Sequence, residues 1–280
     1  MKNNNFIERS LLGAINFTKE SILCDEYALK NGFLQQLDPR IKLLSILLFL
    51  LAILLSKGLY FIVFLYLIVL ILAGLSRIPL LFFLKRSWVF IPLFSLFIAL
   101  PALFNIFTPG EAWVSFRVFG SFFSITKQGI SSASLFFMRV LTSVSFCILL
   151  VLTTKQNILL KTLRYFKIPK VFVMTLGMCY RYIYLFIQIM LDTYLAIKSR
   201  VGFIHSVKKG QGVVSWNIAS FWQRSYRLNQ DVYQAMLSRG YMGESFVLEQ
   251  FKTRALDWLW LSVSVIIFTI VIYLHYLVKV

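Results

Sequence analysis

The hydrophobic pattern of the chain alternates between long apolar stretches and shorter polar connections. A helix needs about 20 apolar residues to cross the hydrocarbon core of a membrane. Five stretches are close to this length, and the first two are short enough that we expect them to extend into their flanks. They cover residues 41–56, 59–75, 88–107, 130–152 and 258–278. The pattern therefore predicts an all-α integral membrane protein with about five transmembrane helices.

The polar N-terminal segment, residues 1–40, ends in signals for the start of the first span. Asp38 can accept a hydrogen bond from the first helical turn, and Pro39 suits the first helical position. Arg40 and Lys42 follow at the point where a helix would enter the bilayer from the cytoplasm. We expect an amphipathic segment on the cytoplasmic side, leading into a helix capped by Asp38.

One polar stretch, residues 192–240, contains the same short motif twice. The motif Asp-x-Tyr-x-Ala-x-x-Ser-Arg begins at Asp192 and again at Asp231, and a glycine follows each copy. Glycine just beyond a helical pattern commonly ends the helix. The stretch predicts two long helices, from about 171 to 207 and from about 214 to 238, separated by a break at 208–212. Each helix would present an arginine at its C-terminal tip.

The two tips have the residue types of a docking element. Alanine and arginine lie four residues apart in each copy and so share a helical face. A small residue lets the helix approach a partner closely, and arginine offers a planar fork to carboxylates or carbonyl groups. Favourable interaction with the helix dipole explains each arginine separately but not the recurrence. We interpret as docking residues Ala196, Ser199, Arg200 and Val201 in the first tip, and Ala235, Ser238, Arg239 and Gly240 in the second.

Composition agrees with a membrane protein and limits its partners. Of 280 residues, 59% are hydrophobic and only 14% are charged, whereas soluble domains carry about 25% charged residues. A net charge of +18 would favour nucleic acid as the partner of a soluble protein. In a membrane protein, basic cytoplasmic loops account for it. We therefore expect contact with the lipid bilayer and no nucleic-acid partner.

Charge also decides the placement of the apolar segment 171–195, which carries Arg181 near its middle. If this segment does not span, 23 Lys and Arg residues share one side of the membrane and four lie on the other. If it spans, the cations of residues 153–170 move to the sparse side, against the positive-inside rule. We expect an amphipathic or partly embedded helix here, with the N-terminus cytoplasmic and the chain in the inner (cytoplasmic) membrane. The predicted organisation is a cytoplasmic segment at 1–40, transmembrane helices 1–4 in 41–152, a cytoplasmic domain at 153–255 and transmembrane helix 5 in 256–280.

Residues able to do chemistry are scarce. His205 and His275 are predicted on opposite sides of the membrane, the three cysteines are scattered, and no carboxylate lies within the five spans. Transport sites and catalytic sites need converging ionisable groups. No Walker A or GxGxxG motif is present. We therefore expect no catalytic residue, no metal site and no cofactor in this chain, which disfavours a stand-alone permease and a membrane enzyme.

Two further arginines each have two interpretations. Arg139 lies within the fourth span, where it is either a partner-facing or gating residue or a structural one bonded to carbonyl or hydroxyl groups of its own bundle. Arg181, flanked by Tyr180 and Tyr182, either lines a partner contact or anchors a helix at the level of the lipid headgroups.

Over nearly its whole length the chain resembles the transmembrane T component of energy-coupling factor (ECF) transporters, within the CbiQ-type cobalt/nickel branch. The similarity lies in Leu37–Leu44, Arg139, Met178–Tyr182 and the two arginine tips, and the stretch Cys24–Arg40 is similar to CbiQ sequences in particular. Both tips depart from the family pattern. Serine replaces the usual alanine before each arginine, and Val201 replaces glycine in the first tip.

The resemblance implies a non-catalytic scaffold within an ABC transporter complex. Two long coupling helices would cross in an X, and each arginine tip would enter a groove in one of two CbiO-like ATPase subunits, which bind the ATP. A separate CbiM-like membrane subunit would capture Co²⁺ or Ni²⁺. The coupling function would lie in residues 153–255, and Asp38, Pro39, Arg40, Arg139 and Arg181 would be partner-contacting or structural. The T component of a vitamin transporter stays an alternative, because only the N-terminal stretch argues against it.

Overall fold

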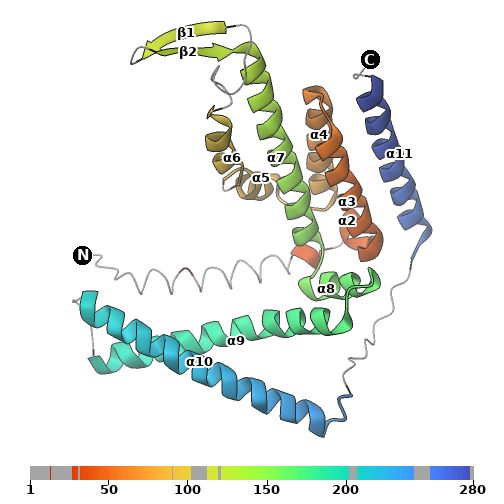
Figure 1. The fold of residues 1–280 in the computed structure, drawn as a ribbon. Helices are drawn as coiled ribbons and strands as arrows, with labels where there is room; N and C mark the ends of the chain where they lie inside the picture. The colour runs from red at the N-terminus through yellow and green to blue at the C-terminus, as the bar shows by residue number, and fades with distance from the viewer. Residues whose placement is uncertain are drawn as a thin grey trace. The chain divides into compact units, whose positions relative to one another are not determined.

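The computed structural model describes residues 27–30, 32–89, 91–101, 112–118, 121–201, 207–242 and 253–277, together with Gly13. The chain divides into two compact units. We call residues 23–159 with 251–280 the bundle unit, and residues 1–22 with 160–250 the long-helix unit. Figure 1 shows the elements of both.

The bundle unit consists of helices and one β-hairpin. Its elements are α2 (Phe33–Gln36), α3 (Pro39–Leu55), α4 (Leu59–Leu75), α5 (Leu80–Val89), α6 (Ile91–Ala99), β1 (Ala112–Val118), β2 (Ser121–Thr126), α7 (Lys127–Thr153) and α11 (Ala255–Leu277). The long-helix unit contains α9 (Lys170–Val201) and α10 (Val207–Ser238). Helix α8 (Gln156–Tyr165) begins in the first unit and ends in the second.

The all-α membrane architecture predicted from the sequence is confirmed. Each apolar stretch that the sequence analysis identified is helical over most of its described part. By length and composition, α7, α11 and residues 170–197 of α9 are each able to cross a membrane. The bent pair α5–α6 adds a fourth candidate if it forms one span. Helices α3 and α4 have 17 residues each, and only α3 extends beyond its predicted start, by two residues.

The third span differs from its prediction. It begins at Leu80 rather than Trp88, so Lys85 and Arg86 belong to α5 and not to a connection. Helices α5 and α6 meet at an angle of 41° at the break between Trp88 and Ile91. Pro92 explains the bend, because a proline inside a helix removes a backbone hydrogen bond and clashes with the carbonyl group four residues earlier.

The hairpin between α6 and α7 was not predicted. Strands β1 and β2 pair antiparallel, with an irregular register between Ala112 and Val114. Their aromatic and β-branched residues are typical of strands. The run is short and lies between two helical spans, so its alternation was not recognised in the sequence.

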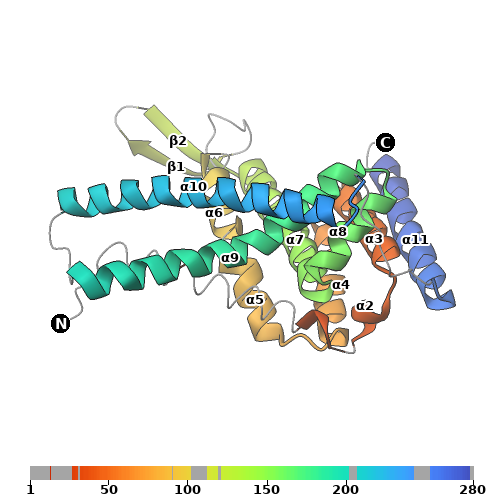
Figure 2. The ribbon, with the colours of Figure 1, turned by 90° about the horizontal axis from the view of Figure 1, so that it is seen from below.

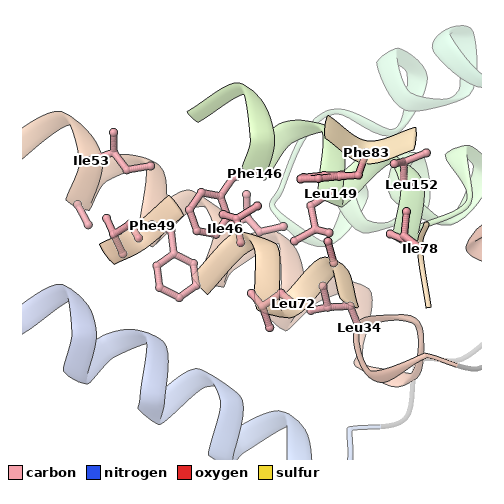
Figure 3. Packing of buried hydrophobic residues seen from close by; sticks show 14 of the residues in the cluster. Leu34, Ile46, Phe49, Ile53, Leu72, Ile78, Phe83, Phe146, Leu149 and Leu152 are labelled. Carbon is pink, nitrogen blue, oxygen red and sulfur yellow. The ribbon is translucent and has the colours of Figure 1, made fainter. Parts of the chain in front are cut away.

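The core of the bundle unit lies between α3, α4 and α7. The rings of Phe49 and Phe146 stack with centroids 5.0 Å apart. Figure 3 shows Phe146 and Leu149 of α7 close to Ile46 and Phe49 of α3. From α11, Val271 is buried in the same cluster. The aromatic stack therefore marks the middle of an α3–α7 interface.

Polar contacts join the antiparallel helices α3 and α7 at both ends. Lys42 in the first turns of α3 donates from Nζ to the carbonyl oxygen of Thr153 (3.1 Å) and to Oγ1 of Thr154 (3.0 Å), at the end of α7. Arg139 of α7 donates to the carbonyl oxygen of Ser56 at the end of α3, over 2.7 Å. Lys42 is only 1% exposed. The expectation that it simply marks the membrane entrance is incomplete, because its side chain turns into the bundle.

A close approach of α2 to the end of α4 gives a first prediction. A Cβ atom added at Gly32 would lie 2.7 Å from Cα of Ser76 and 2.8 Å from its carbonyl carbon, and Gln35 Nε2 donates to the Ser76 carbonyl group over 3.0 Å. We expect Gly32→Ala to lower the free energy of unfolding by about 1–3 kcal/mol, because α2 must move away. Denaturant unfolding of the full chain in detergent micelles would measure this.

The control for this prediction is Gly74→Ala in α4, where an added Cβ meets nothing within 4 Å. Alanine favours a helix over glycine by up to about 1 kcal/mol, so we expect the control to be neutral or slightly stabilising. Equal stabilities for the two variants would contradict the close packing at Gly32.

Candidate functional site

The two long helices that carry the repeated motif cross one another. Each has 32 residues, or about 48 Å at 1.5 Å per residue. They touch near their midpoints, where the ring centroids of Phe186 and Phe221 are 4.7 Å apart. The crossing is seen in Figure 1, and Figure 2 shows the same pair from below.

A second contact fixes the direction of the pair. Just after α10, the Tyr241 hydroxyl group donates to Sδ of Met174, in the first turns of α9, over 3.0 Å. The end of α10 therefore lies near the beginning of α9, and Arg200 lies at the other end of α9. Met174 and Arg200 are 26 positions apart, about 40 Å along a helix. The two arginine tips are separate sites at opposite ends of the pair.

Helix α10 ends as its sequence predicts. Gly240 has φ +78°, a left-handed conformation that glycine adopts without strain. Its N–H donates to the Leu237 carbonyl group (2.9 Å), and the Tyr241 N–H donates to that of Met236 (3.0 Å). These two bonds form a Schellman C-cap. Arg239 therefore stands exposed directly after the last helical residue, Ser238.

The first tip has a similar form but a different boundary from the predicted one. Arg200 is exposed in the last turn of α9, which ends at Val201 rather than near 207. Helix α10 already begins at Val207, so the break predicted at 208–212 lies inside a helix. Glycine lowers helix propensity by about 1 kcal/mol without preventing a helix, which explains the error. Gly202 and His205, and the side chains of Val201 and His275, lie outside the described residues.

The serines that precede the two arginines keep their hydroxyl groups occupied. Ser199 Oγ donates to the Ala196 carbonyl group, and Ser238 Oγ to that of Gln234, each over 2.9 Å. A serine that bonds to its own helix remains a small side chain with no hydroxyl hydrogen pointing outward. Each tip therefore has a small side chain next to its arginine. Ala196 and Ala235 are further small residues exposed at the two tips.

Large apolar side chains are exposed near both arginines. Leu195 is 60% exposed on α9, and Leu237 is 50% and Met242 93% exposed around the end of α10. Arginine among exposed apolar groups is the composition of an energetically important protein contact. The geometry is that of two binding tips.

The other candidate residues have local partners. Asp38 accepts from the Arg40 backbone N–H over 2.9 Å, and Pro39 occupies the first position of α3, as predicted. The bond from Arg139 to Ser56 is the structural alternative that the sequence left open. Its partner-facing role stays a prediction.

Arg181 is exposed on α9. It follows Tyr180, whose hydroxyl group lies 2.7 Å from that of Tyr184. Both interpretations of Arg181 remain open. Among the residues that the structure describes, no three His, Cys, Asp or Glu side chains come together as metal ligands would.

Sequence reasoning missed Asp257, a buried carboxylate at the start of α11 that contacts α3. The available signal was a lone acidic residue at the entrance to an apolar span. This position is the third of its helix, where carboxylates commonly bond to the backbone.

Comparison with known proteins identifies the family. Residues 30–249 match the family model of CbiQ, described as a cobalt transport protein. An uncharacterized protein of Methanocaldococcus jannaschii is 36% identical over 270 residues, covering 95% of this chain and 90% of the relative. A second uncharacterized protein of that organism is 28% identical over 276 residues, covering 95% and 96%.

A relative with a described role is the energy-coupling factor transporter transmembrane protein EcfT of Streptococcus thermophilus. It is 31% identical over 159 residues, covering 54% of this chain and 57% of the relative. The family match spans most of the chain, and the first archaeal relative aligns over nearly all of both proteins. The chain with the two crossed helices therefore belongs to the CbiQ/EcfT family of membrane components of energy-coupling factor transporters.

Proposed function

We propose that this chain is the coupling (T) component of an ECF-type ABC importer. In this role it transmits ATP hydrolysis from two cytoplasmic ATPase subunits to a separate membrane subunit that binds the substrate. The observation that carries the proposal is the pair of similar, exposed arginine tips at opposite ends of the crossed helices α9 and α10. Family membership supplies the transport context.

Two similar partner subunits would explain why the tip motif occurs twice. The tips share alanine, serine and arginine at equal offsets and are about 40 Å apart along the helix pair. One partner with one groove would need only one of them. Two copies of the same ATPase subunit, or two related subunits, would each receive one tip, with the arginine fork meeting carboxylate or carbonyl oxygens.

The crossing supplies a pivot in this proposal. Helices α9 and α10 touch at Phe186 and Phe221, and each arginine lies more than a dozen residues from that contact. When ATP brings the two ATPase subunits together, the two tips would move relative to each other, and the helices would turn about the crossing. The chain needs no cofactor for this work, because the partner subunits bind the ATP.

The positive-inside rule supports a cytoplasmic position for α9 and α10. In that arrangement the basic residues between α7 and α11 lie on the same side as the N-terminus. Helix α9 is apolar enough to pass as a span, which also suits a helix lying at the membrane surface. It belongs with α10 in the long-helix unit rather than with the bundle, and this favours the surface position.

The substrate proposed is Co²⁺ or Ni²⁺, captured by a CbiM-like membrane subunit, with CbiO-like ATPase subunits. The match to the cobalt transport protein family supports this branch. A vitamin transporter with the same coupling helices is the alternative, because the name of the similar EcfT protein gives no substrate. Metal uptake by cells that express the complete complex distinguishes the two.

Reversing both tip charges tests the coupling role. We expect Arg200→Glu with Arg239→Glu to reduce the ATPase subunits that copurify with the chain by at least about tenfold, because a central arginine contributes about 2 kcal/mol or more to an interface. ATP-dependent Co²⁺ uptake should be lost in parallel. Quantitative pull-down and uptake in proteoliposomes measure the two effects.

The matched control is Arg224→Glu, which reverses an exposed charge in the middle of α10, away from either tip. It should retain both the ATPase subunits and uptake. Unimpaired uptake by the double tip variant would contradict the coupling role.

Labelling of single cysteines tests the sidedness. With the native cysteines replaced by serine, we expect a cysteine at Gly210 to react with a membrane-impermeant maleimide only from the cytoplasm. A cysteine at Lys57, exposed between α3 and α4, should react only from outside. Reaction of position 210 from outside would refute the five-span topology.

A further inference from the structure

Two of the three chain connections between the units adjoin segments that are bonded to the same helical turn. One leaves the bundle unit within α8, a few residues after Thr153 and Thr154 at the end of α7, and the other returns at residue 251, shortly before Arg254 at the start of α11. The end of α7 and the start of α11 are both bonded to the first turn of α3. We call Asp38, Lys42, Thr154 and Asp257 the anchor cluster.

Lys42 fastens the first connection. Its ammonium group donates to the Thr153 carbonyl oxygen over 3.1 Å and to Thr154 Oγ1 over 3.0 Å. The carbonyl groups at a helix C-terminus carry partial negative charge, so a cation there is stabilised. A hydrogen bond made by a charged group is also stronger than a neutral one. The end of α7 is therefore held to α3 by a directional contact.

Asp257 fastens the second connection. One carboxylate oxygen accepts from the Asp38 backbone N–H over 2.8 Å, and the other accepts from the Arg254 backbone N–H over 2.7 Å. The bond to Arg254 is half of a capping box and fixes the first turn of α11. The bond to Asp38 ties that turn to the start of α3.

The free energy needed to bury its charged groups indicates that the cluster fixes geometry rather than stabilises the fold. Lys42 and Asp257 are each 1% exposed, and burying charged groups costs free energy that apolar residues of similar volume would not. The aromatic and aliphatic core already holds α3 against α7. Unlike an apolar contact, directional hydrogen bonds fix the positions of the end of α7 and the start of α11.

We propose that the anchor cluster is where movement of the long-helix unit enters the bundle, and that Lys42 and Asp257 are positioning residues for transport. The inference rests on the proposed coupling function and adds the route of transmission. Because the segments beside these two connections are bonded to one turn of α3, a displacement of α9 and α10 pulls on α7 and α11 at fixed points. Without the cluster, the connections would loosen and absorb the movement.

Three variants remove parts of the cluster. Lys42→Met keeps the length of the side chain and removes its donors. Asp257→Asn turns one accepting oxygen into a donor that faces a backbone N–H. Thr154→Val removes a single hydroxyl group with little change of shape, so it keeps the test decisive if either charged variant fails to assemble.

The matched control is Thr142→Val. Thr142 is fully buried in α7, and its hydroxyl group bonds only to the Met138 carbonyl group of the same helix in the contacts described (2.8 Å). Thr142→Val, like Thr154→Val, removes one threonine hydroxyl group, but it changes no described contact between helices.

The experiment compares uptake with ATP hydrolysis. Each variant is purified with its ATPase and substrate-binding subunits and placed in proteoliposomes, and radiolabelled Co²⁺ uptake is divided by the ATP hydrolysed. We expect Lys42→Met and Asp257→Asn to keep their ATPase subunits and hydrolyse ATP, while uptake per ATP falls about tenfold, as the loss of a charged hydrogen bond would produce. For Thr154→Val we expect a fall of about threefold, and for Thr142→Val no change.

If the cluster variants take up as much Co²⁺ per ATP as the wild type, the proposed role of the anchor cluster is wrong. It is also wrong if Thr142→Val lowers uptake per ATP as much as Thr154→Val does. A wild-type complex that assembles no ATPase subunits or shows no ATP-dependent uptake would instead refute the proposed function. The two failures are therefore distinguishable.

Discussion

The contact between α3 and α7 is the interaction on which the bundle unit depends. In lipid the hydrophobic effect does not drive helices together, so close packing and polar contacts must hold them. Here an aromatic stack of Phe49 on Phe146 lies in the middle of the interface, and a cation closes each end. Lys42 meets the last carbonyl of α7, and Arg139 meets the carbonyl that follows α3. The two helices cannot slide along each other without breaking both contacts.

The long-helix unit is built differently. Its two helices make few mutual contacts, with an aromatic contact at the crossing and a bond from Tyr241 to Met174. Many of its large apolar side chains remain exposed, Trp222 and Tyr233 among them. Surfaces of this kind are characteristic of regions that bind other proteins. The bundle unit is therefore joined along a whole helix interface, whereas the two long helices are joined at their crossing and at one end.

Much of this arrangement could be predicted from the sequence. Hydropathy located the helices, Pro39 and Asp38 gave the start of α3, and Gly240 gave the end of α10. These features depend on local chemistry, which a short stretch of sequence contains. The break predicted at 208–212 was wrong because glycine only weakens a helix. The hairpin was missed because strand pairing depends on a partner segment.

The remaining features could not be read from local sequence. That Lys42 turns inward depends on the end of α7, more than a hundred residues away. Asp257 was overlooked because its partner, the Asp38 backbone, is likewise distant. The arginine tips were predictable in part. Their spacing and exposure were predictable, whereas their position at opposite ends of the helix pair follows from tertiary contacts.

The most direct measurement of the account is a cross-linking experiment on the two tips. A cysteine-depleted chain would carry a photoreactive label at Ser199 and at Ser238, each exposed next to its arginine, in the complex with its ATPase subunits. Intact-mass analysis then counts the subunits attached to each chain. Attachment of two ATPase subunits, one through each label, is the predicted result. Attachment of both labels to one subunit, or of neither, would contradict the claim that this chain couples two ATPase subunits to the membrane.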